Sequence, residues 1–67
     1  MAMVERELKK KAYDEIMGIF RTMARVNAPM TMIPFRMAEI MREYGISNFE
    51  VSMLSREVLY EINYQIV

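Results

Sequence analysis

Acid–base chemistry is the main catalytic option in this 67-residue sequence, and few residues could carry it. The carboxylates are eight glutamates and Asp14, and the chain has no His and no Cys. It therefore lacks the side chain that titrates nearest neutral pH, which is also the commonest metal ligand. It also has no thiolate nucleophile, no disulfide and no Cys-rich zinc site. Because no Ser-His-Asp or Cys-His site can be built, we expect a protein that is not an enzyme and has no metal or cofactor.

Composition limits what the chain could bind. It is 54% hydrophobic, with nine basic and nine acidic side chains, which is too apolar and too neutral for a disordered chain. The longest weakly charged stretch, residues 26–35, is far shorter than the roughly 20 residues that span a bilayer. The mixed charges of residues 5–11 do not resemble a signal peptide. We expect a soluble, cytoplasmic protein without a membrane partner.

Apolar residues recur every three or four positions in three segments, which is the period of an α-helix. We predict an all-α fold, a compact domain over residues 1–67 with helices at about 3–25, 31–44 and 48–65. The first helix should stop near Asn27 because Pro29 follows. Thr31 could cap the second helix, with Pro34 in its first turn, and Gly45 should end it in a left-handed conformation.

The start of the third helix carries two local signals. Ser47 and Glu50 have the spacing of a capping box, and Ile46 and Val51 that of a hydrophobic staple. The same helix is apolar on two sides. One stripe comprises Val51, Leu54, Val58, Ile62 and Ile66, and the other comprises Met53, Tyr60, Tyr64 and Val67. Because a three-helix monomer can hardly cover both, we expect self-association through the first and third helices, most simply as a two-fold dimer.

A DNA-binding helix-turn-helix is one interpretation of the two helices around Gly45. The turn Gly45-Ile46-Ser47 has the length and the glycine that such motifs prefer. Under this interpretation Asn48, Ser52 and Arg56 would contact bases, and Lys9, Lys10 and Lys11 would contact phosphates. Met41 stands where the motif usually has a small residue, and acidic residues outnumber basic ones by three to one from position 46 onward. Affinity for DNA depends largely on cations.

Residues 45–59 read Gly-Ile-Ser-Asn-Phe-Glu-Val-Ser-Met-Leu-Ser-Arg-Glu-Val-Leu. They resemble the small sporulation-regulating aspartyl-phosphate phosphatases of bacilli, in which a Gly-Leu-Thr turn precedes a Glu-Val pair and Leu-Ser-Gln-Glu-Leu-Asp. The matching residues are Gly45, Glu50, Val51, Leu54, Ser55 and Glu57. Leu59 replaces the family's hallmark Asp. The resemblance therefore implies a helical hairpin that docks on a partner rather than an active phosphatase.

Methionine and tyrosine favour a protein partner. Met30 and Met32 lie between two prolines, where they could either close the end of the bundle or form an exposed edge with Phe35. Tyr60 and Tyr64 are four residues apart, so they can stack on one helix face and suit an interface. We interpret the chain as a small non-enzymatic regulator or adaptor that binds a protein, as a homodimer. The alternatives are a dimeric DNA-binding regulator and a degenerate phosphatase-like hairpin.

Overall fold

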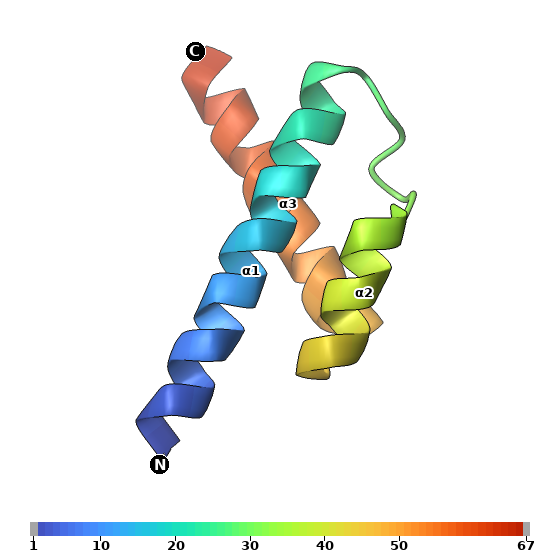
Figure 1. The fold of residues 1–67 in the computed structure, drawn as a ribbon. Helices are drawn as coiled ribbons and strands as arrows, with labels where there is room; N and C mark the ends of the chain where they lie inside the picture. Colours follow the sequence, from blue (N-terminus) through green and yellow to red (C-terminus); the bar gives the residue numbers. More distant parts are fainter. Residues whose placement is uncertain (1, 67) are drawn as a thin grey trace.

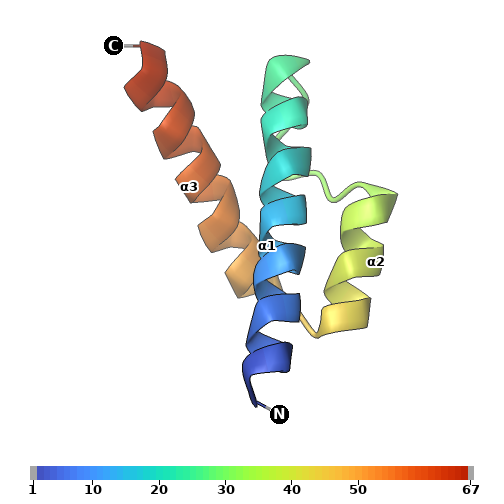
Figure 2. The ribbon, with the colours of Figure 1, turned by 60° about the vertical axis from the view of Figure 1, so that its left-hand side comes forward.

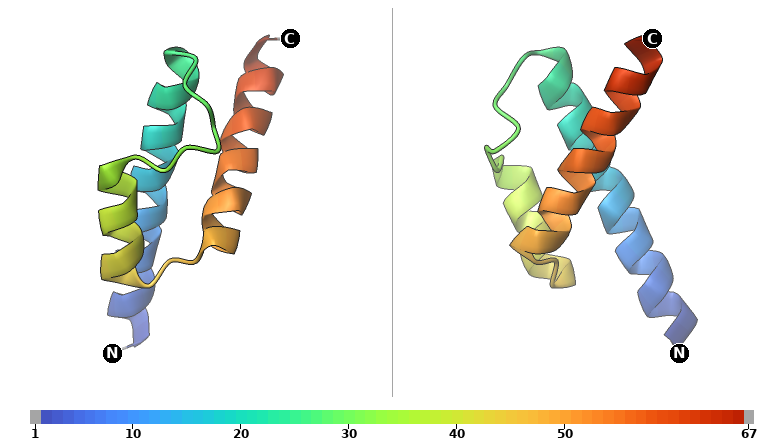
Figure 3. Two further views of the ribbon diagram at one scale, coloured as in Figure 1. Left: turned by 90° about the vertical axis from the view of Figure 1, so that its right-hand side faces the viewer. Right: turned by 180° about the vertical axis from the view of Figure 1, so that it is seen from behind.

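The computed structural model describes the backbone of residues 2–66 and the side chains of residues 7–64. It contains three helices, α1 (Ala2–Arg25), α2 (Phe35–Tyr44) and α3 (Asn48–Ile66), and the described residues contain no strand (Figure 1). This confirms the predicted all-α, three-helix fold. Figure 2 shows α1 between the other two helices, and α1 is the helix that both of them approach most closely. Seen from the side, α3 forms one layer, and α1 and α2 form the other (Figure 3, left).

Helix α1 ends as the sequence predicts. Asn27 has a left-handed backbone with φ of 59°. The N–H of Asn27 donates to the carbonyl of Ala24 at 3.2 Å, and the N–H of Ala28 donates to the carbonyl of Met23 at 2.8 Å. This pair of bonds is a Schellman motif, which satisfies carbonyls that have no partner within the helix. Pro29 then prevents the helix from resuming.

Helix α2 begins at Phe35, so the predicted start at residue 31 is wrong. Thr31 is not an N-cap but lies in a turn in which the N–H of Met32 donates to the carbonyl of Pro29 at 3.1 Å. Pro34 is the N-cap residue, with an extended backbone, and no side chain caps the helix. The reason is steric, because a proline disfavours the helical conformation in the residue before it. This constraint on Ile33 outweighs the capping preference of Thr31.

Gly45 ends α2 with φ of 63°, as expected, and the N–H of Ile46 donates to the carbonyl of Met41 at 2.9 Å. Helix α3 then starts at the predicted cap. The Ser47 hydroxyl accepts the N–H of Glu50 at 3.2 Å. The Glu50 carboxylate completes no capping box, because it accepts a hydrogen bond from the Tyr13 hydroxyl at 3.2 Å instead. Half of the predicted box is therefore replaced by a contact between α1 and α3.

The core lies along α1. Its buried side chains are Ala12, Ile16, Phe20 and Met23 from α1, Met37 and Ile40 from α2, and Ile46, Val51 and Val58 from the turn and α3. Leu54 and Ile62 pack against this core from α3, so the first predicted stripe faces inward. Ile66 and Val67 lie outside the described side chains. Two exposed ion pairs hold the helices together at the surface: Arg21 with Glu61 joins α1 to α3, and Arg36 with Glu15 joins α2 to α1.

Candidate functional site

The connection between α1 and α2 places Met30 and Met32, whose exposure the sequence could not decide, in different environments. Met30 is half-buried and packs against the core. Met32 is 48% exposed and Phe35 is 77% exposed. Ile33, which the sequence did not single out, is 45% exposed. The connection therefore turns Met32, Ile33 and Phe35 outward and packs Met30 inward, so the two methionines take different arrangements of the two that the sequence left open.

An apolar hollow of about 590 Å³ lies between this connection and α1. Ile19 and Val26 line it from α1, and Met32 and Pro34 line it from the connection. Gly18 also lines it, and a Cβ atom added at Gly18 would meet nothing within 4 Å. The glycine therefore leaves open space instead of allowing a close crossing within the chain. The sequence did not predict this hollow, because it forms only where the connection returns over α1.

A second hollow of about 420 Å³ lies between the connection and the first half of α3. Phe20 and Val51 line it from the core, and Asn48 and Ser52 line it from α3 beside the connection. The two α3 residues expected to contact bases thus share a hollow with residues 30–33. In a helix-turn-helix the first residues of the second helix contact base edges, so a segment beside them would have to leave room for the duplex.

The basic residues nominated for phosphate contacts lie elsewhere. Lys9 is 3.8 Å from the carboxylate of Glu50, which offsets its charge. Glu50 and Asn48 are two residues apart and therefore point to different sides of α3. Lys10 and Lys11 are exposed on α1, and Arg56 is exposed on α3. The structure accordingly does not gather the six nominated residues on one face.

Tyr60 and Tyr64 are exposed, at 68% and 73%, on the side of α3 that faces away from the core. Their ring centroids are 5.7 Å apart, which confirms the predicted contact between them. Met53 and Phe49 are also exposed, at 52% and 73%, and helical spacing places them on the same side. We call these four residues the outer seam. The second apolar stripe predicted for α3 is therefore uncovered, and it also includes Phe49.

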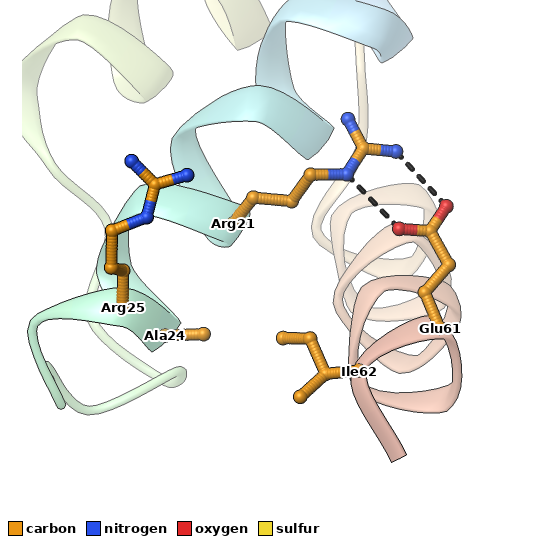
Figure 4. Close-up of a pocket in the computed structure, with 5 residues that line it drawn as sticks. All are labelled: Arg21, Ala24, Arg25, Glu61 and Ile62. Atoms are coloured by element: carbon orange, nitrogen blue, oxygen red, sulfur yellow. Dashed lines mark hydrogen bonds and ion pairs between the residues drawn. The ribbon is translucent and has the colours of Figure 1, made fainter. Parts of the chain in front are cut away.

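A third hollow, with a charged pair at its edge, lies where the last turns of α1 and α3 diverge (Figure 4). It has a volume of about 300 Å³, and the aliphatic side chains of Ala24 and Ile62 face each other across it. Arg21 donates two hydrogen bonds of 3.0 Å to the Glu61 carboxylate. These bonds lower the pKa of Glu61 and raise that of Arg21. A carboxylate held in its ionised form is a poor proton donor near neutral pH.

The described residues contain no group of three acidic side chains arranged to hold a metal ion. None of the helices described is both long and apolar enough to cross a bilayer. Leu59, at the hallmark position of the phosphatase family, is 41% exposed on α3. Comparisons of the chain with known protein families, with curated proteins and with solved structures found no match.

Proposed function

We propose that this chain is a small non-enzymatic regulator or adaptor that binds a protein partner at the hollow over Gly18. The observation that carries the proposal is the combination of that hollow with exposed apolar residues around it. Val26 is 67% exposed, Met32 is 48% exposed, and both line the hollow. Phe35, which is 77% exposed, directly follows Pro34 at its edge. Apolar surface of this kind, gathered around a concavity, is typical of an interaction site.

The shape of the hollow favours an amphipathic helix as the bound segment. It follows α1 from Glu15 to Val26, which is about 16 Å along a helix at 1.5 Å per residue. Gly18 allows the backbone of a partner to approach closely, because no side chain stands between them. The ion pair between Glu15 and Arg36 supplies a polar rim at one end. Apolar anchors spaced along one face of a helix suit such a groove.

The test is a selection of helical peptides from a display library, followed by affinity measurements with variants. Gly18→Leu fills the hollow without crowding the fold, since nothing lies near its Cβ position. We expect Gly18→Leu and Met32→Glu each to weaken the selected peptides at least tenfold. Leu8→Glu is the matched control, because Leu8 is similarly exposed on α1 at 44% but does not line the hollow. Peptides that bind all four proteins equally would contradict the proposal.

We further propose that the module is a homodimer that associates through α3. Of the apolar side chains described on α1, most are buried against its neighbours, whereas the outer seam of α3 remains exposed over almost its whole length. Exposed aromatic residues are enriched at protein interfaces. Self-association would therefore use the seam and leave the hollow over Gly18 free for another protein. Sedimentation velocity at increasing concentration tests this, and a monomer at every concentration would exclude it.

DNA binding is the second candidate function, and the turn between α2 and α3 favours it. Gly45 is left-handed and Ile46 is buried, as the corresponding positions of a helix-turn-helix require. This candidate needs the cations of Arg56, Lys10 and Lys11 to reach one duplex. The dependence of binding on salt distinguishes it from protein binding.

A further inference from the structure

The outer seam of α3 has a charged pair at its middle. Met53 and Tyr60 are seven residues apart, so two helical turns separate them on nearly the same line along the helix. Arg56 is three residues after Met53 and falls about 60° to one side of that line, and Glu57 falls about 40° to the other. Both are exposed, and neither makes an ion pair with any side chain of residues 7–64. The seam therefore has an apolar centre line, a cation on one flank and an anion on the other.

We propose that a second copy of this chain covers the seam, with the two α3 helices parallel and in register about a two-fold axis between them. In that arrangement the flank carrying Arg56 in one copy meets the flank carrying Glu57 in the other. Symmetry repeats the contact, so two ion pairs form. Met53 meets Met53 and Tyr60 meets Tyr60 across the axis, as residues on the centre line of parallel paired helices do. This inference rests on the proposed homodimer and specifies its geometry.

The charges select the parallel arrangement over the antiparallel one. In an antiparallel pair, two-fold symmetry brings each flank against the same flank of the other copy. With the seams aligned on their middles, Arg56 would meet Arg56 and Glu57 would meet Glu57. Like charges at such positions destabilise paired helices, whereas opposite charges set the partner and the orientation. No other helix interferes, because α1 and α2 lie in the layer on the far side of α3 (Figure 3, left).

The absence of cysteine from the chain makes the geometry directly measurable. Met53→Cys and Tyr60→Cys would each be the only thiol, on an exposed side chain whose replacement does not disturb the core. In the parallel pair both thiols lie beside the two-fold axis, and we expect both variants to be cross-linked efficiently by oxidation or a short bismaleimide. In an antiparallel pair, positions seven residues apart cannot both lie at the axis, because about 10 Å of helix separates them. Leu8→Cys, on α1, is the control and should not be cross-linked.

A charge exchange tests the ion pairs independently. We expect Arg56→Glu to weaken the dimer roughly tenfold or more, because two attractions become two repulsions. Glu57→Arg should do the same, and the double variant R56E/E57R should restore the affinity of the original protein. In an antiparallel pair the single variants would exchange one set of like charges for another, and no rescue would be seen.

The outcomes separate this geometry from the proposed homodimer. A dimer in which Met53→Cys and Tyr60→Cys both self-link, with rescue by the charge exchange, supports the parallel seam. A dimer in which only one thiol or neither self-links overturns the geometry but leaves self-association in place. A chain that remains monomeric at every concentration overturns both. Peptide binding at the hollow over Gly18 is measured on different residues and can stand in any of these cases.

Discussion

The two glycines of the chain provide a sharp test of the structure, because alanine at each should change stability in opposite directions. A Cβ atom at either position would meet nothing within 4 Å, so crowding plays no part. Gly18 lies inside α1, where glycine costs about 1 kcal/mol relative to alanine. Gly45 has φ of 63°, a conformation that costs a residue with a Cβ atom about 1–2 kcal/mol. Gly18→Ala should therefore stabilise the fold, and Gly45→Ala should destabilise it.

The expected difference is large enough to measure in a domain of this size. A change of 1 kcal/mol shifts the Tm of a 60–100-residue domain by about 4–8 °C. Gly18→Ala should therefore raise the Tm by about that amount, and Gly45→Ala should lower it by at least as much. The assay is thermal unfolding followed by circular dichroism. It is performed at low micromolar concentration so that self-association adds little to the stability of any variant.

The result for Gly18 also tests the hollow itself. If Gly18→Ala lowers the Tm, an atom must approach the backbone at that position, and the space over Gly18 is not open in the free protein. If Gly45→Ala leaves the Tm unchanged, the residue does not have the left-handed conformation, and the turn between α2 and α3 differs from the one described. The proposal for a partner helix depends on the first result, whereas the helix-turn-helix interpretation depends on the second.

Three further predictions concern the core, the ion pair and DNA. Ile16→Val should lower the free energy of unfolding by about 1 kcal/mol, because Ile16 is fully buried. Phe35→Ala should change it by less than about 0.5 kcal/mol, because Phe35 is exposed. Urea unfolding measures both changes, and equal losses for the two variants would contradict this difference in burial. The hydrogen bonds from Arg21 lower the pKa of Glu61 in the folded protein below its ordinary value of 4.5. The stability that these bonds supply is therefore fully present above pH 4.5, and it is lost as the pH falls through the lowered pKa of the folded protein. Glu61→Gln should thus lose less stability between pH 7 and pH 3 than the original protein, and equal losses would refute the assignment. If the chain binds a protein and not DNA, we expect no binding to duplex DNA at about 50 mM salt. Binding at about 50 mM salt that weakens by orders of magnitude at about 200 mM would instead favour DNA binding, the second candidate function.

The features that could be predicted from the sequence are those decided by neighbouring residues. The end of α1 at Asn27, the left-handed Gly45 and the Ser47 cap each depend on the chemistry of two or three adjacent positions. The start of α2 was mispredicted because Thr31 and Pro34 gave conflicting local signals. The cap residue contributes about 1 kcal/mol, and the steric restriction that Pro34 imposes on the preceding residue prevailed.

The candidate sites were less predictable because they depend on tertiary arrangement. The exposure of Tyr60 and Tyr64 followed from helical spacing, since the opposite side of α3 was already apolar enough to serve as the core. Met30 and Met32 have the same chemistry and almost the same sequence context, yet only Met32 points outward. Likewise, the Glu50 carboxylate suits a capping box, but its contact with Tyr13 depends on where α1 lies.

The residues that contribute least to the fold are the ones that carry the functional proposals. Glycine at position 18 makes α1 less stable than alanine would, and among the described residues nothing lies within 4 Å of the place where a Cβ atom would stand. Tyr60 and Phe49 place most of their aromatic surface in solvent, although polar residues would serve an exposed helix face equally well. These features form two surfaces that share no residue. If both are interfaces, Gly18→Leu should weaken peptide binding at least tenfold without affecting the dimer, and Arg56→Glu should weaken the dimer without affecting peptide binding. A variant of one surface that impaired both activities would show that the hollow and the seam belong to a single interface.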